Sequence, residues 1–152
     1  MSWDVYLIKS AANDEATPDE VENPVPVATK SEVYDWLRQN YPEMDLTGEG
    51  CPVLFAEEYS VEFVLDEEEQ QDQIWLIIQG DEAPYELIEA MCRAFDCRAV
   101  DTGTGGFLEG KETSSFEEWK DFREQVKAEY EAADEKGWRG MLRSLCDWFT
   151  GK

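Results

Sequence analysis

Apolar runs alternate with acidic stretches along the chain and predict a series of short strands. The first run, "WDVYLIK" at residues 3–9, carries apolar side chains at alternating and at intervening positions. This pattern is typical of a strand that is covered on both sides. Further apolar runs predict strands at residues 52–56, 60–66, 73–80 and 98–102. The strands at 52–56, 60–66 and 73–80 follow one another closely, and we expect them to form an antiparallel meander.

Two segments have the periodicity of amphipathic helices. Thr29-x-x-Glu32 has the pattern of a capping box and starts a helix that ends at Pro42. Pro84 suits the first turn of a second helix, and the acids around it suit the positive end of that helix. The apolar positions are Val33, Trp36, Leu37 and Tyr41 in the first helix, and Leu87, Ile88, Met91, Cys92 and Phe95 in the second.

The order of these elements predicts the fold class. We expect an α+β domain at residues 1–110, with a single mixed, mostly antiparallel sheet in the order β-α-β-β-β-α-β and two helices on it. Residues 10–29 are acidic, contain several prolines and lack a period, which indicates a solvated surface loop. The alternative interpretation is that these residues form a functional loop, because loops of this length are uncommon inside a compact domain.

The last part of the chain, residues 111–152, has a different pattern. Ser115-x-x-Glu118 can cap a helix, Gly137 interrupts the periodicity, and a second apolar run follows from Trp138. We predict a C-terminal helical hairpin that forms an appendage. Its aromatic stripe is expected to pack on the sheet or the first helix; a dimer or partner groove and a membrane surface are the alternatives.

The charge of the chain limits the kinds of partner that it can bind. The net charge of the 152 residues is −23, and the 54 residues between Arg38 and Arg93 contain fifteen Asp or Glu and no Lys or Arg. Ion pairs within that region cannot neutralise the acids. Such a surface repels nucleic acid and anionic lipid and speeds encounter with basic partners. Because no membrane span or signal peptide is apparent, we expect the protein in the cytoplasm.

The residues that are missing exclude most catalytic chemistry. The chain has no histidine, which removes Ser-His and Cys-His nucleophiles and imidazole bases. Phosphoryl transfer needs basic residues around the phosphates, and the central region has none. Glu57, Glu58 and Glu62 offer paired carboxylates of the kind that glycosidases use, but an acidic face is the simpler interpretation. We predict no catalytic residue, no metal site and no cofactor.

Two motifs remain open to more than one interpretation. "VDTGTGGF" at residues 100–107 is predicted to be a turn that ends a strand; its spacing does not match a phosphate loop, nor a calcium loop that would use Asp101 and Glu109. The cysteines Cys51, Cys92, Cys97 and Cys146 lack the paired C-x2-C spacing of zinc sites. Buried free thiols are expected, with metal binding or disulfides as the alternatives.

Several motifs together resemble a known family. "MSWDVYLI", "SVEFVL", "IWLIIQGDEAPYELI" and "RAVDTGTGGFLE" resemble a family of small uncharacterised bacterial proteins that begin M-S-W-D-[IV] and carry a D-x-x-T-G-x-F turn. The resemblance covers most of residues 1–110. It implies a bacterial cytosolic α+β domain and transfers no activity.

The function that we predict is therefore binding rather than catalysis. The first hypothesis is an inhibitor or immunity protein that covers a basic partner such as a nuclease toxin. The alternatives are a DNA mimic, a cytosolic domain whose acidity is environmental adaptation, and an enzyme that uses carboxylates alone. The predicted partner-binding residues are Asp66, Glu67, Glu68, Glu69 and Asp72 in the connection between two strands, with Asp81 and Glu82 before the second helix.

Overall fold

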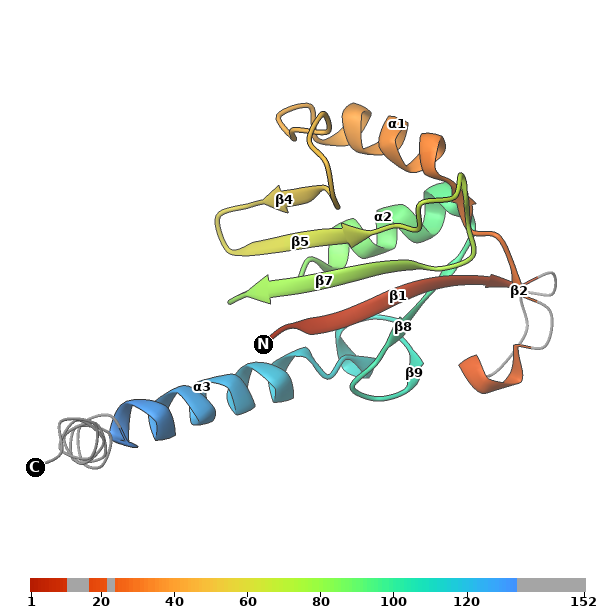
Figure 1. Cartoon of the computed structure of the whole chain (residues 1–152). Helices are drawn as coiled ribbons and strands as arrows, with labels where there is room; N and C mark the ends of the chain where they lie inside the picture. The colour runs from red at the N-terminus through yellow and green to blue at the C-terminus, as the bar shows by residue number, and fades with distance from the viewer. Residues whose placement is uncertain (11–16, 22–23, 134–152) are drawn as a thin grey trace, which may run out of the picture. The chain divides into compact units, whose positions relative to one another are not determined.

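A computed structural model describes residues 1–10, 17–21 and 24–133 of the chain. The chain divides into two compact units, Met1–Phe116 and Glu117–Lys152. The predicted boundary after residue 110 lies slightly before this division. The first unit is an α+β domain built on one main sheet (Figure 1).

The main sheet contains seven strands in the order β4-β5-β7-β1-β8-β9, with β2 paired to β1 (Figure 1). Its strands are β1 (Trp3–Ser10), β2 (Pro24–Val25), β4 (Val53–Phe55), β5 (Tyr59–Val64), β7 (Ile74–Gly80), β8 (Arg98–Asp101) and β9 (Gly106–Phe107). Each pairing within the described residues is antiparallel. The parallel pairing that a mixed sheet needs is not found in this part of the chain. The meander β4-β5-β7 has the predicted order.

One face of the sheet forms the core. Val5 pairs with Leu76 of β7, and Leu76 pairs with Phe63 of β5, and all three side chains are fully buried. The opposite face is half-exposed, and there Tyr6 stacks on Trp75 with 4.8 Å between the ring centroids. The prediction that β1 is covered on both sides was therefore wrong. On its second face the half-exposed Tyr6 is covered in part by the ring of Trp75.

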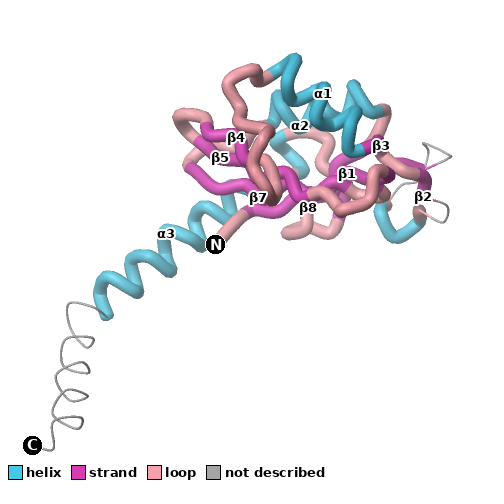
Figure 2. Tube along the Cα trace, turned by 45° about the horizontal axis from the view of Figure 1, so that its top comes forward, coloured by secondary structure: helices cyan, strands magenta, loops and turns pink. Residues whose placement is uncertain are grey.

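Helices α1 (Lys30–Asn40) and α2 (Tyr85–Phe95) lie side by side over the sheet (Figure 2). The ring of Tyr85 meets the buried Trp3 at 6.2 Å, which places α2 on the core face. Trp36 of α1 packs against Phe95 at the end of α2, with 6.2 Å between the ring centroids. Both hydrogen bonds of the predicted capping box at Thr29 and Glu32 are present. The two helices cover the face that the alternating apolar residues of the strands create.

The predicted loop at residues 10–29 was wrong in part. Ser10 is the last residue of β1 and pairs with Pro24 of β2. A second, small sheet pairs β3 (Ala28–Thr29) with β6 (Gln70–Gln71), and Val27 and Ala28 are buried. Val27 and Ala28 thus belong to the core, because they are apolar residues between the acidic part of the segment and the first helix. A short 3-10 helix, η1 (Pro18–Glu20), precedes it.

After β9, the 3-10 helix η2 (Lys111–Thr113) leads to α3 (Phe116–Ala133). Phe116, the last residue of the first unit, is buried against the ring of Trp3 at 5.2 Å. The second helix of the predicted C-terminal hairpin falls outside the described residues, and the packing of its aromatic stripe stays a prediction. None of the helices within the described ranges is both long and apolar enough to cross a bilayer.

Candidate functional site

The acidic connection between β5 and β7 is held in place by a buried glutamine. The side chain of Gln71 accepts a hydrogen bond from the Asp66 N–H at 2.8 Å and donates to the carbonyls of Asp66 and Glu68 at 3.2 and 2.6 Å. Gln71 is fully buried, and Gln70–Gln71 is the short strand β6. Part of the predicted connection at residues 66–72 is therefore strand rather than loop. The Gln71 side chain connects the start of the loop to its end by hydrogen bonds, and β6 pairs with β3.

Glu69 has a structural role within this connection. Its carboxylate Oε1 accepts a hydrogen bond from the Ser31 N–H at 2.9 Å, and its carbonyl accepts one from the Lys30 N–H at 2.6 Å. These N–H groups belong to the first turn of α1, where no intrahelical acceptor is available. The hydrogen bond from Ser31 lowers the pKa of Glu69. Glu69 therefore caps a helix, and the exposed carboxylates left for a partner here are Asp66, Glu67, Glu68 and Asp72.

The two other predicted residues, Asp81 and Glu82, lie at the opposite end of β7. Their backbone N–H groups both donate to the Glu58 carbonyl, at 2.9 and 3.3 Å, so they adjoin the turn between β4 and β5. The seven residues of β7 separate this end from the acidic connection by about 20 Å, at about 3.3 Å per residue. The structure thus divides the predicted residues between two surfaces. We name them the loop surface (Asp66, Glu67, Glu68, Asp72) and the turn surface (Phe55, Glu57, Glu58, Asp81, Glu82).

The turn surface contains a large exposed aromatic side chain. Phe55, the last residue of β4, is 81% exposed and lines a shallow depression together with Glu57, Glu58 and Asp81. The backbone is close here, because Gly80 adopts a φ of +135° and its α-carbon faces the backbone of Tyr59. Sequence analysis did not single out Phe55. The available signal was its position, since it alternates with Leu54 and stands directly before an acidic turn.

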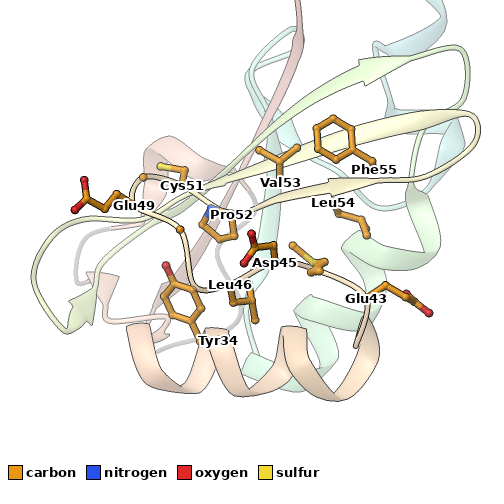
Figure 3. A pocket seen from close by; sticks show the side chains of 13 residues that line it. Tyr34, Glu43, Asp45, Leu46, Glu49, Cys51, Pro52, Val53, Leu54 and Phe55 are labelled. Carbon is orange, nitrogen blue, oxygen red and sulfur yellow. The ribbon is translucent and has the colours of Figure 1, made fainter.

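A cavity of about 380 Å³ opens beside Phe55, between α1, the following loop and β4 (Figure 3). Tyr34 extends from α1 towards this loop, and Asp45 lies between Glu43 and Glu49 along it (Figure 3). Lys and Arg are absent from the residues that line the cavity in the described part of the chain. The lining is otherwise apolar: Met44, Leu46, Cys51, Pro52, Val53, Leu54 and Phe55. An apolar pocket with carboxylates around it favours a ligand that has an apolar stem and a positive end.

The local electrostatics keep this end of the domain negative. The Thr47 side chain and N–H both donate to Asp45 Oδ1, at 2.6 and 3.0 Å, and lower the pKa of Asp45. Burial raises the pKa of Tyr59, and the negative charge of Glu86 raises it further. Burial also raises the pKa of Tyr41, with contributions from Tyr59 and Glu86. Asp45 therefore stays ionised in mild acid, while the two phenols stay neutral in mild alkali.

The motif "VDTGTGGF" forms the predicted turn at the end of β8. Gly105 has a φ of +74° and donates its N–H to the Asp101 carbonyl at 2.8 Å. The Asp101 carboxylate is buried and accepts hydrogen bonds from Trp3 Nε1, the Gly103 N–H and Ser115. Glu109, the other residue considered for a calcium loop, pairs instead with Arg98 at 2.9 Å. Both carboxylates thus have protein partners, which favours a structural role for the motif.

The remaining candidate groups are placed as follows. Glu57 and Glu58 lie in the turn after β4, whereas Glu62 lies in the middle of β5, opposite Ile77. The described cysteines Cys51, Cys92 and Cys97 are free thiols, but they are half-buried rather than buried. Cys51 lies in the loop before β4, and Cys92 and Cys97 lie at the C-terminal end of α2. Cys146 falls outside the described residues.

Comparison of the chain with protein-family models, with curated proteins and with solved structures gives no match. The resemblance described above therefore stays a prediction, and the function has to be argued from the residues.

Proposed function

We propose that this chain is a non-catalytic acidic binding protein that covers a basic surface of another protein, as an inhibitor or immunity protein covers a nuclease toxin. The observation that carries the proposal is the turn surface, where Phe55 is 81% exposed next to four carboxylates. Charges at the rim of an interface mainly set the rate of association and its specificity, whereas affinity comes from a few desolvated anchors. The turn surface offers both.

The cavity beside Phe55 supports the same assignment. A Lys or Arg side chain of the partner can bury its apolar stem against Leu46 and Val53 while its charge meets Asp45 and Glu43. The cavity volume of about 380 Å³ is within the range of pockets that bind small ligands, about 300–1,000 Å³. The Phe55 ring also lines the cavity and can interact with a cation through its face.

The loop surface is the weaker candidate of the two. Its four carboxylates are exposed, and the residues of the connection beside them are mostly Gln and Glu. Phe55 is the large apolar side chain with the greatest exposure among the described residues, and it lies at the other end of the sheet. We therefore propose that the loop surface attracts the basic partner over a distance and that the turn surface makes direct contact with it.

Two matched variants test this assignment. Glu57→Lys/Glu58→Lys changes the turn surface, and Glu67→Lys/Glu68→Lys makes the same change of charge on the loop surface. Glu69 stays untouched because it caps α1. Each tagged chain, together with Phe55→Ala, is used to capture proteins from a lysate of the source organism at low and at high salt. Captured proteins are then purified and titrated against the chain by calorimetry.

The expected result is one basic protein, bound in a fixed ratio, that survives high salt. It should be lost with Glu57→Lys/Glu58→Lys and with Phe55→Ala and kept, at a reduced association rate, with Glu67→Lys/Glu68→Lys. Release of many nucleic-acid-binding proteins together by salt would instead indicate a DNA mimic or mere polyanion behaviour. Capture of nothing would leave the acidity as adaptation to the environment and refute the proposal.

A further inference from the structure

The C-terminal end of α2 brings two cysteines together. The Cys97 N–H donates to the Cys92 carbonyl at 3.0 Å, across the last turn of the helix, and Asp96 between them has a φ of +49°. This is the six-to-one hydrogen bond of a Schellman motif, in which the side chains at its two ends contact each other. Here those two residues are Cys92 and Cys97, so the turn places their thiols next to each other.

The thiol pair lines an open cavity of about 420 Å³ between α2, β8 and the segment after β9. Both cysteines are half-buried, so a small reagent can reach them from this cavity. Charged groups of both signs face the pair: Glu89 and Asp96 from the helix and its end, Lys9 from β1, and Arg98, Glu109 and Lys111 from the cavity wall. The cavity therefore has cationic side chains within an otherwise acidic protein.

We propose that Cys92 and Cys97 are a redox-active dithiol that closes to an intramolecular disulfide by exchange with a small disulfide such as oxidised glutathione. A disulfide requires Cα atoms about 4.4–6.8 Å apart, and the six-residue turn and the shared cavity already bring Cys92 and Cys97 together. Disulfides in cytosolic proteins are usually transient and redox-responsive. The inference does not depend on the proposed binding function, because the pair lines a different cavity from Phe55.

The exchange takes place in two balanced steps. The Cys92 thiolate attacks one sulfur of the small disulfide, so that one S–S bond breaks, a mixed disulfide forms on Cys92 and one small thiolate leaves. The Cys97 sulfur, after loss of its proton to solvent, then attacks the Cys92 sulfur and releases the second small thiolate. The protein has lost two electrons and two protons, and the small disulfide has gained both and been reduced to two thiols.

The two neighbouring thiols have pKa values that are shifted in opposite directions. The neighbouring Cys97 thiol lowers the pKa of Cys92, although burial and the charge of Glu89 act in the opposite direction. The neighbouring Cys92 thiol raises the pKa of Cys97, together with burial. Because the thiolate is the nucleophile, Cys92 is expected to take the first adduct and Cys97 to resolve it.

The test uses the full chain with Cys51→Ser and Cys146→Ser, which leaves only the proposed pair. The protein is equilibrated with graded ratios of oxidised to reduced glutathione, quenched in acid, alkylated and measured by intact mass and peptide mapping. Addition of Cys97→Ser to this background should trap one glutathione on Cys92. A chain that keeps Cys51 as its sole cysteine is the matched control for an isolated half-buried thiol. Circular dichroism verifies that each variant is folded.

The expected product has lost two hydrogen atoms, links Cys92 to Cys97 and reopens when reduced glutathione is added. Its equilibrium constant should be about tenfold higher in the folded chain than in urea, because the fold holds the thiols in place. Three results would overturn the proposal: glutathione adducts on both cysteines without closure, unreacted thiols at a ratio that modifies Cys51, or an equal equilibrium constant in urea. An equal constant in urea would mean that the disulfide forms only because the two cysteines are close in the sequence, and not because the fold holds them together.

Discussion

Substitution of Asp101 by Asn gives the most direct test of how the structure is held together. Asp101 Oδ1 accepts from Trp3 Nε1 at 3.2 Å, from the Gly103 N–H at 2.8 Å and from Ser115 Oγ at 2.7 Å. Oδ2 accepts from the Ser115 N–H at 2.7 Å. One side chain thus joins the first strand, the turn after β8 and the residue that precedes α3. Asn has the same shape but keeps only one acceptor oxygen.

The loss of stability follows from these contacts. If the amide oxygen takes the place of Oδ1, the amide NH₂ faces the buried Ser115 N–H, and one charge-assisted hydrogen bond worth about 1.5–3 kcal/mol is lost. The other bonds become neutral and lose about half of their strength. Relief of the burial of a charge offsets part of this loss. We expect a decrease of about 3 kcal/mol in the free energy of unfolding, a large fraction of the ~5–15 kcal/mol of a typical domain.

Urea unfolding followed by circular dichroism measures this decrease. At a slope of about 2 kcal/mol per molar urea, the midpoint should fall by about 1.5 M. Asp72→Asn is the matched control, because Asp72 is exposed and the change removes the same negative charge from a protein of charge −23. The control should stay within about 0.5 kcal/mol of the unmodified chain. A loss below about 1 kcal/mol for Asp101→Asn, after correction by the control, would refute the assigned role of the carboxylate.

Four further variants test the two ends of the sheet. Gln71→Ala removes three hydrogen bonds and should cost about 2–3 kcal/mol in urea unfolding and increase hydrogen exchange in residues 66–69. Gly80→Ala places a methyl group 2.6 Å from the Tyr59 α-carbon and should destabilise the domain by ~2 kcal/mol or more, again in urea. Glu69→Gln should destabilise the chain at pH 7 but not in acid below the lowered pKa of Glu69, since this contribution is fully present above about 4.5 and is lost as the pH falls through that lowered pKa. Phenylalanine at both Tyr41 and Tyr59 should flatten the loss of stability in alkali, because raised phenol pKa values stabilise the fold below about pH 10 and this contribution is lost at higher pH; unchanged alkaline unfolding would contradict it.

Local patterns in the sequence predict the elements that have regular periods. Apolar runs located five strands of the main sheet, β1, β4, β5, β7 and β8, because burial selects apolar side chains along a strand. The capping box at Thr29 and Glu32 located the start of α1 to the residue, since its two hydrogen bonds are formed within four residues. The α+β class with a mostly antiparallel sheet followed from the order of these elements.

Contacts between distant residues are not visible in such patterns. The strands β2, β3, β6 and β9 each contain two residues, too few for any period. Glu69 and Gln71 stand in a run of acids and glutamines that gives no sign of burial or capping, because the partner of Glu69 lies 38 residues away. Asp101 likewise meets Trp3 across the sheet, 98 residues away. The predicted partner-binding residues lie on two surfaces for a related reason. Asp72 and Asp81 are close in the sequence, but the extended strand β7 between them places them at opposite ends of the sheet.

The backbone hydrogen bonds of the turn surface affect how tightly a partner could be bound. The Asp81 and Glu82 N–H groups share the Glu58 carbonyl, and the Ala56 N–H donates to the Tyr59 carbonyl at 2.9 Å, so the backbone of the turn surface is fixed by hydrogen bonds. Ordering a flexible loop on binding opposes affinity, and a preformed surface avoids much of that cost. Repulsion among the carboxylates is meanwhile offset by the core of the folded domain, and a basic partner would relieve it. A binding protein of this kind should therefore gain stability when its partner neutralises the turn surface, whereas a domain with merely adaptive acidity should gain as much from salt alone.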